Sequence, residues 1–131
     1  MTDKVQPVFG PTNREQSSDK TQRFGAVIGL ESEFEQKYRE LHANVWPSVL
    51  RRIERSNIRN YSIYTTEILG DKYLFSYFEY VGDNLDNDLK AMALDEDTQR
   101  WWKETDVCQI RLPNAMPDEN WHRMEQVFYN N

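Results

Sequence analysis

Residues 38–47 read YRELHANVWP and place a phenol, an imidazole and an indole at Tyr38, His42 and Trp46. Side chains four residues apart lie on nearly the same face of an α-helix, so these rings are expected to form one row. An apolar stripe runs beside the row, at Phe34, Leu41, Val45 and Val49. Imidazole transfers protons near neutral pH, and neighbouring aromatic rings hold flat, weakly polar ligands. The row therefore predicts a small-molecule site, and a carbohydrate suits it.

The segments before and around this row predict a strand followed by a long helix. Residues 24–30 form a short apolar run that is typical of a buried strand. Ser32 and Glu35 have the spacing of a capping box, which predicts a helix start there and a helix running to about Arg55. Pro47 lacks a backbone donor, so we expect a kink in the helix just before it.

The second half of the chain predicts a hairpin, further helices and a last strand. Alternating segments at residues 60–66 and 72–81 flank a Gly70-Asp71 turn. Asp83 or Asn84 is expected to cap a helix, and the acidic residues 95–97 are expected to open another. Residues 125–129 predict the closing strand. The order is β-α-β-β-α-β, which predicts an α+β fold, the ferredoxin-like sandwich. Helices on one face leave the other face bare, which predicts a homodimer.

Composition and charge narrow the classes of partner. A chain of 131 residues is about one domain, and a net charge of −6 argues against nucleic acid as a partner. No apolar run reaches membrane-spanning length, and a single cysteine, Cys108, fits a reducing compartment. We therefore expect a cytoplasmic protein without membrane contact. Residues 1–22 are polar and without periodicity, which predicts a disordered or loosely attached extension ahead of a domain at residues 23–131.

Further aromatic residues are candidates for the same site. Adjacent helical side chains point about 100° apart, so one of Trp101 and Trp102 can enter the core while the other faces a cavity. Tyr61 alternates with Ile63 on a strand, and its hydroxyl could reach that cavity; simple packing explains it equally well. Two distant histidines and no clustered cysteines predict no metal site.

Four motifs in this order resemble the L-rhamnose mutarotase family. They lie at residues 38–47, 60–64, 100–103 and 126–129, and the resemblance spans nearly all of residues 23–131. It implies a dimeric α+β barrel that interconverts the α and β anomers of a deoxyhexose by acid/base ring opening, without cofactor or metal. It also implies a proton donor at His42. The sugar-binding positions that it implies are Tyr38, Tyr61, Trp101 and Trp102.

Residues 104–120 depart from the family pattern and could rim the cavity. The sugar therefore stays open between L-rhamnose, L-fucose and another related sugar, and the second proton-transfer group is not identified. Two other functions are compatible with the same fold. One is a cofactor-free monooxygenase or haem-binding dimeric α+β barrel protein, and the other is a sugar-binding module without turnover.

Overall fold

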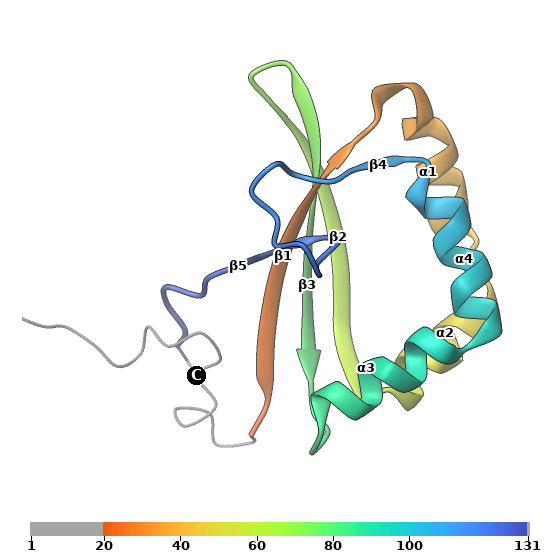
Figure 1. Ribbon diagram of the computed structural model, residues 1–131, viewed down its shortest axis with the longest axis vertical. Helices are drawn as coiled ribbons and strands as arrows, with labels where there is room; N and C mark the ends of the chain where they lie inside the picture. The colour runs from red at the N-terminus through yellow and green to blue at the C-terminus, as the bar shows by residue number, and fades with distance from the viewer. Residues whose placement is uncertain (1–19, 131) are drawn as a thin grey trace, which may run out of the picture.

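One layer of helices covers one face of a curled antiparallel sheet (Figure 1). The computed structural model describes residues 20–130, so the extension predicted at residues 1–22 lies largely outside the described part. The strands are β1 (Gln22–Leu30), β2 (Ile58–Ile68), β3 (Asp71–Tyr80), β4 (Gln109–Ile110) and β5 (His122–Met124). The helices are a 3-10 turn η2 (Ser32–Phe34), α1 (Glu35–Ala43), α2 (Pro47–Arg55), α3 (Leu85–Leu94) and α4 (Glu96–Asp106). No helix in this part of the chain is long and apolar enough to cross a membrane.

The sheet has the order β2-β3-β1-β4, and β5 pairs with β1 on the same side as β4. The central strands β1 and β3 pair along their whole length, from Gln22 opposite Tyr80 to Leu30 opposite Lys72. Leu69 and Gly70 join β2 to β3 with φ angles of 53° and 89°, as expected for a tight two-residue hairpin loop. The predicted β-α-β-β-α-β fold is confirmed, with each helical segment divided in two.

The helix predicted from Ser32 to Arg55 with one kink is instead a 3-10 turn and two helices. Pro47 is the first residue of α2, and Trp46 before it is extended, with φ −61° and ψ 131°, as the proline ring requires. The predicted capping box is wrong, because Phe34 occupies the N-cap of α1 and no side chain caps it. The Glu35 carboxylate, which the box would have turned back towards Ser32, pairs with Lys72 and Arg39.

The other two predicted helix starts are confirmed. Asn84 caps α3 by accepting a hydrogen bond from the backbone N–H of Asn87. Asp95 caps α4 in the same way, through the N–H of Thr98. Short polar side chains at these positions satisfy backbone donors that lack partners inside the helix. The Asp95 cap thereby fixes where α4 begins, and with it the positions of Trp101 and Trp102 on that helix.

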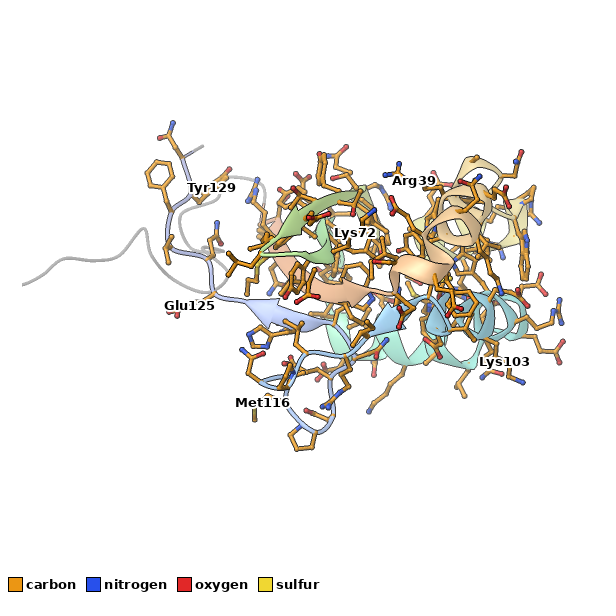
Figure 2. All side chains as sticks on the ribbon, turned by 90° about the horizontal axis from the view of Figure 1, so that it is seen from above. Arg39, Lys72, Lys103, Met116, Glu125 and Tyr129 are labelled. Atoms are coloured by element: carbon orange, nitrogen blue, oxygen red, sulfur yellow. The ribbon has the colours of Figure 1, made fainter. Side chains whose placement is uncertain are left out.

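The strand predicted at residues 125–129 is wrong. The closing strand is β5, three residues earlier in the chain, where Val27 of β1 lies opposite His122. Residues 125–130 have no regular secondary structure and extend away from the helix layer (Figure 2). Val127 and Phe128 are 68 % and 65 % exposed, and the Arg23 guanidinium lies over the Tyr129 ring. An apolar, β-branched pattern indicates a strand only where a sheet edge is present to pair with it.

The buried core lies between β1, β3 and the helices. Its central cluster consists of Ile28, Leu30, Tyr38, Leu74 and Cys108, with Phe34, Ile63 and Trp121 packed against it. Cys108 is fully buried, as expected for a small packed residue. The expectation that the whole Tyr-His-Trp row lies beside the core is wrong for Tyr38. Tyr38 is itself part of the core and is the buried residue of α1, with 5 % of its surface exposed.

Candidate active site

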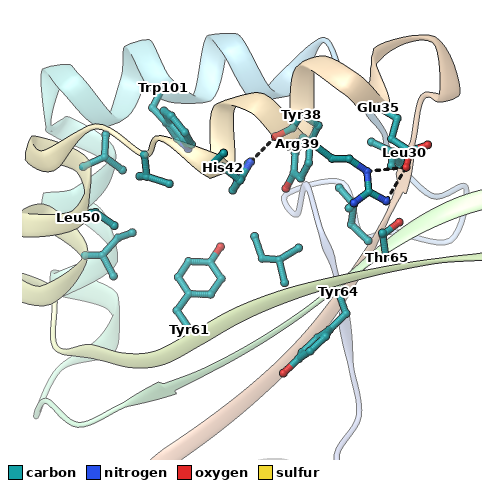
Figure 3. Close-up of a pocket in the computed structure, with 16 residues that line it drawn as sticks. Leu30, Glu35, Tyr38, Arg39, His42, Leu50, Tyr61, Tyr64, Thr65 and Trp101 are labelled. Atoms are coloured by element: carbon teal, nitrogen blue, oxygen red, sulfur yellow. Dashed lines mark hydrogen bonds and ion pairs between the residues drawn. The ribbon is translucent and has the colours of Figure 1, made fainter.

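Two pockets that share a wall lie between the helices and the sheet and are here called the two lobes of the site. Figure 3 shows the residues that line the first. One lobe, here called the apolar lobe, has a volume of about 580 Å³. Apart from the wall that it shares with the second lobe, it is lined mainly by aliphatic residues, among them Leu30, Val49, Ile53 and Leu74. The other, the polar lobe, has about 450 Å³ and adds Trp102, Thr105, Asp106, Gln109, Asn120 and Trp121. The wall common to both lobes consists of Tyr38, His42, Tyr61, Ile63 and Trp101. Four of the five predicted site residues, Tyr38, His42, Tyr61 and Trp101, therefore line both lobes, and Trp102 lines the polar lobe alone.

The His42 ring contacts two aromatic rings and is hydrogen-bonded at one nitrogen. It stacks on Tyr38, with ring centroids 4.2 Å apart, and lies edge-to-face with Trp101 at 5.3 Å. Its Nδ1 lies 2.9 Å from the backbone oxygen of Tyr38. A carbonyl oxygen only accepts hydrogen bonds, so Nδ1 carries the proton and Nε2 of the neutral ring has a free lone pair. Burial lowers the pKa of His42 below its ordinary value of 6.5, and the hydrogen bond to Tyr38 opposes that change in part.

Trp101 connects the aromatic rings that the sequence placed in one row. It projects from α4, is 7 % exposed, and contacts His42 on one side and Trp46 on the other, at 5.2 Å. Because the helix breaks before Pro47, Trp46 does not continue the stack of Tyr38 and His42 directly. Trp101 fills that place from another helix. The four rings form a continuous series, with the imidazole between a phenol and an indole.

The two tyrosines of the common wall present hydroxyl groups that remain neutral. Burial raises the pKa of Tyr38, and the nearby side chain of Gln109 opposes that rise in part. Loss of water around the hydroxyl raises the pKa of Tyr61 as well, although 45 % of this residue is exposed. A phenol with a raised pKa is a hydrogen-bonding group rather than a base near neutral pH. These hydroxyls suit the binding of a neutral polyol.

A β-bulge places Tyr61 towards the helices. The pairing of β2 with β3 shifts its register between Arg59 and Ser62, and Asn60 has a φ of 51°. A bulge of this kind re-aims a side chain. Figure 3 shows the Tyr61 ring rising from the sheet with its hydroxyl towards the side of His42 and Tyr38. Its ring rests against Phe78 at 5.7 Å.

Trp102 differs from Trp101 as the helical geometry predicts. It is 40 % exposed, whereas Trp101 is nearly buried. Trp102 faces the polar lobe, together with the side chains of Gln109 and Asp106. This lobe combines indole rings with amide and carboxylate groups. Carbohydrate binding uses the same combination, rings against C–H faces and polar groups against hydroxyls.

Several cavity residues were not predicted from the sequence. Glu35 and Arg39 line the apolar lobe, where Glu35 pairs with Arg39 and Lys72, and these pairs hold the pKa of its carboxyl below the ordinary value. Gln109 and Trp121 lie at β4 and just before β5, and Gln109 belongs to residues 104–120, the segment that departs from the family pattern. Only the pairing of these short strands with β1 brings them to the cavity. The spacing of Glu35 and Arg39, four residues apart, was the one available signal.

Within residues 20–130, no three His, Cys, Asp or Glu side chains are grouped so that they could hold a metal ion. The groups able to move protons in the common wall are an imidazole and two phenols. These side chains supply proton transfer and hydrogen bonding at the wall. An imidazole with a lowered pKa is the group suited to act near neutral pH.

The fold resembles a solved structure of L-rhamnose mutarotase from Formosa agariphila, with a TM-score of 0.62. The likeness covers 84 % of this chain and 99 % of that one, at 23 % identity, and supports the fold. Two L-rhamnose mutarotases, from Lactiplantibacillus plantarum and Bacillus subtilis, are each 27 % identical to this chain over 81 residues. Those segments cover 62 % of this chain and 73 % of each relative.

The family resemblance drawn from the four motifs is confirmed, and with it the enzyme class, an isomerase acting on a carbohydrate. The model of the L-rhamnose mutarotase family matches residues 23–130. That range includes every residue that lines the two lobes, from Leu30 to Trp121. By its sequence, its fold and its cavity, the chain belongs to the L-rhamnose mutarotase family.

Proposed function

We propose that this chain interconverts the α and β anomers of L-rhamnose, with Nε2 of His42 as the proton-transfer atom. The observation that carries the proposal is the hydrogen bond of His42 Nδ1 to the Tyr38 carbonyl, within a cavity large enough for a monosaccharide. It fixes the tautomer, and the stacked rings fix the orientation. Burial keeps the resting ring neutral near pH 7, because it lowers the pKa.

The reaction begins when neutral His42 accepts the proton of the anomeric hydroxyl at Nε2. The electron pair of that O–H bond forms the carbonyl at C1, the bond from C1 to the ring oxygen breaks, and the ring oxygen takes a proton from water in the cavity. Rotation about the bond between C1 and C2 exposes the other carbonyl face. The ring then closes as the former ring oxygen attacks C1 and returns its proton to the hydroxide left by the water, and protonated His42 acts as the proton donor that restores the anomeric hydroxyl. Atoms and charges balance without any oxidant or cofactor.

The sugar is held by the aromatic and phenolic groups around His42. We assign the hydroxyl groups of Tyr38 and Tyr61 to hydrogen bonds with sugar hydroxyls, and Trp101 and Trp102 to the C–H faces of the ring. The aliphatic part of the apolar lobe, around Val49, Ile53 and Leu74, favours a 6-methyl group over a hydroxymethyl group, because a hydroxyl buried against these side chains would lack partners. These assignments favour a 6-deoxyhexose.

We propose further that two copies pair through the sheet face that carries no helices. Leu74 lies in the core, so Tyr73 and Phe75, its neighbours on β3, point to the opposite face. Their rings lie 6.5 Å apart and are half-buried, and the C-terminal segment adds the exposed Val127 and Phe128. Apolar surface of this kind supports association between copies. A free, buried Cys108 suits the cytoplasm, which we propose as the location.

NMR exchange between the anomers of L-rhamnose tests the proposal. We expect the wild type to accelerate exchange and His42→Ala to lose about 10²- to 10⁴-fold of that acceleration, the usual contribution of a general acid/base. Retained binding of L-rhamnose by His42→Ala would show that the cavity is intact. Absence of acceleration by the wild type would refute the proposal for this sugar, and L-fucose would be tested next.

A further inference from the structure

One wall of the polar lobe comes from the loop between β4 and β5. This loop brings Asn120 and Trp121 to the cavity that His42 and Trp101 line from the helices. Trp121 is half-buried and packs against the core cluster that contains Tyr38 and Cys108. An indole in this place lies in the same lobe as Trp102. It is the one aromatic ring of the polar lobe that no helix or long strand carries.

The loop is closed by a dense set of hydrogen bonds around Glu119. Its carboxylate accepts from the backbone N–H of Met116 at 2.9 Å, from Nδ1 of His122 at 2.9 Å and from the N–H of Arg123 at 3.3 Å. These donors hold the pKa of Glu119 at about 2, with the Met116 N–H the largest cause and His122 the next. The carboxylate thereby ties the middle of the loop to the start of β5.

Arg111 closes the same loop from its other end. Its Nε donates to the backbone oxygen of Glu119 at 2.9 Å, and its Nη2 donates to those of Ala115, at 3.3 Å, and Met116. One guanidinium therefore holds three carbonyl groups of an exposed segment. Surface loops ordinarily have few such bonds and are mobile. In this loop the bonds converge on the residue directly before Asn120 and Trp121.

The position of Trp121 is fixed from both sides. Glu119 and Arg111 hold the chain before it, and His122 directly after it lies opposite Val27 in the sheet. A side chain that merely filled the core would need only the strand and the packing. The additional polar network fixes the direction of an indole at a cavity wall, as expected for a ring that receives a ligand.

We infer that Trp121 is a substrate-contacting residue of the polar lobe, and that Glu119 and Arg111 are positioning residues for it. The ligand chemistry is a C–H face of a reducing hexose, with the indole N–H as donor to one of its hydroxyls. The inference rests on the proposed function for the identity of the sugar. It also gives a role to the segment that resembles the family least.

The test compares kcat and KM for L-rhamnose exchange in the wild type, Trp121→Ala, Trp121→Phe and Glu119→Gln. Trp121→Ala removes the indole ring and is expected to raise KM and the Kd for L-rhamnose roughly tenfold, while kcat changes less than twofold. Trp121→Phe keeps the apolar packing, lacks the N–H donor, and is expected to raise both roughly threefold. Glu119→Gln is also expected to raise KM, because the loop then holds Trp121 less firmly. Glu104→Gln removes a carboxylate that pairs with Lys37 away from the cavity, and serves as the matched control.

The outcomes separate this inference from the proposed function. Unchanged KM and Kd in the folded Trp121→Phe variant, or a fall in kcat alone, would overturn the inference and leave the mutarotase proposal standing. A wild type that binds L-rhamnose without exchanging its anomers would overturn the proposed function alone. A wild type that neither binds nor exchanges it would overturn both. An equal rise in KM for Glu104→Gln and Glu119→Gln would contradict the assignment of Glu119 as a positioning residue for Trp121.

Discussion

The two histidines of this chain lie in regions built on different principles. His42 is enclosed by aromatic rings from α1 and α4, and its one hydrogen bond in this region goes to a backbone carbonyl. His122 lies at the start of β5 in a loop held by hydrogen bonds, and its Nδ1 is bonded to the Glu119 carboxylate. The first region leaves one ring nitrogen free at a cavity, whereas the second uses its histidine to fasten the chain.

The comparison teaches which surroundings make a histidine chemically useful. A carbonyl fixes the tautomer without supplying a charge, and burial then lowers the pKa of His42 so that the ring stays neutral. The Nδ1 of His122 is instead bonded to the Glu119 carboxylate, which itself accepts from the backbone N–H groups of Met116 and Arg123, so this ring is one member of the network that holds the loop. The kind of partner at Nδ1 therefore separates a proton-transfer role from a fastening role.

The largest expected effect comes from replacing His42, the histidine that we assign to proton transfer. Replacing His42 by Gln keeps a side chain of similar reach but removes the imidazole, and anomer exchange should fall about 10²- to 10⁴-fold. His122→Gln is the matched change in the other region and should lower the exchange rate less than tenfold, through the loop alone. NMR exchange rates of the two variants, measured side by side, check this. Equal losses would mean that the two histidines share one role.

The next effect concerns the rings that enclose His42. Trp101 is nearly buried between His42 and Trp46, so Trp101→Ala should lower the free energy of unfolding by about 3–5 kcal/mol. Trp102 is 40 % exposed, and Trp102→Ala should cost less than about 1.5 kcal/mol. Urea denaturation of both variants measures the difference. Similar costs would contradict the assignment of Trp101 to the core and Trp102 to the lobe.

The smallest expected effect lies in the loop around His122. The pKa of Glu119 is lowered from an ordinary 4.5 to about 2, so the stability from its hydrogen bonds is complete above pH 4.5 and is lost as pH falls towards 2. The protection factors of the backbone amides of Met116 and Arg123, which correct the exchange rates for their intrinsic pH dependence, should therefore fall over this range. In Glu119→Gln the same amides should exchange faster already at pH 6, with less further change on acidification.

The sequence predicted the region of His42 far better than the region of His122. Helical spacing of Tyr38 and His42 and the adjacency of Trp101 and Trp102 are local patterns, and local geometry carries them into the structure. The βαββαβ order likewise followed from alternation, caps and the hairpin turn. The family motifs then joined these pieces into one site, which spacing alone could not do.

The remaining features depend on contacts between distant segments. Trp121 reaches the cavity because β5 pairs with β1, and the three residues of β5 carry no pattern that distinguishes them from a loop. The apolar pattern of residues 125–129 predicted the strand three residues too late. Ser32 and Glu35 formed a plausible capping box, but the cations of Lys72 and Arg39 attract the Glu35 carboxylate more strongly. In each case a tertiary contact outweighed a local preference.

The most direct test of the account compares the pH dependence of catalysis with the titration of His42. Anomer exchange, measured at L-rhamnose concentrations far below KM, should rise with pH because the neutral imidazole is the resting proton acceptor. The midpoint should lie below the ordinary 6.5 and should coincide with the midpoint of the His42 ring signals in an NMR titration of the free protein. A rate that falls as pH rises, or a midpoint that differs from that of His42, would contradict the assignment of His42 as the proton-transfer residue.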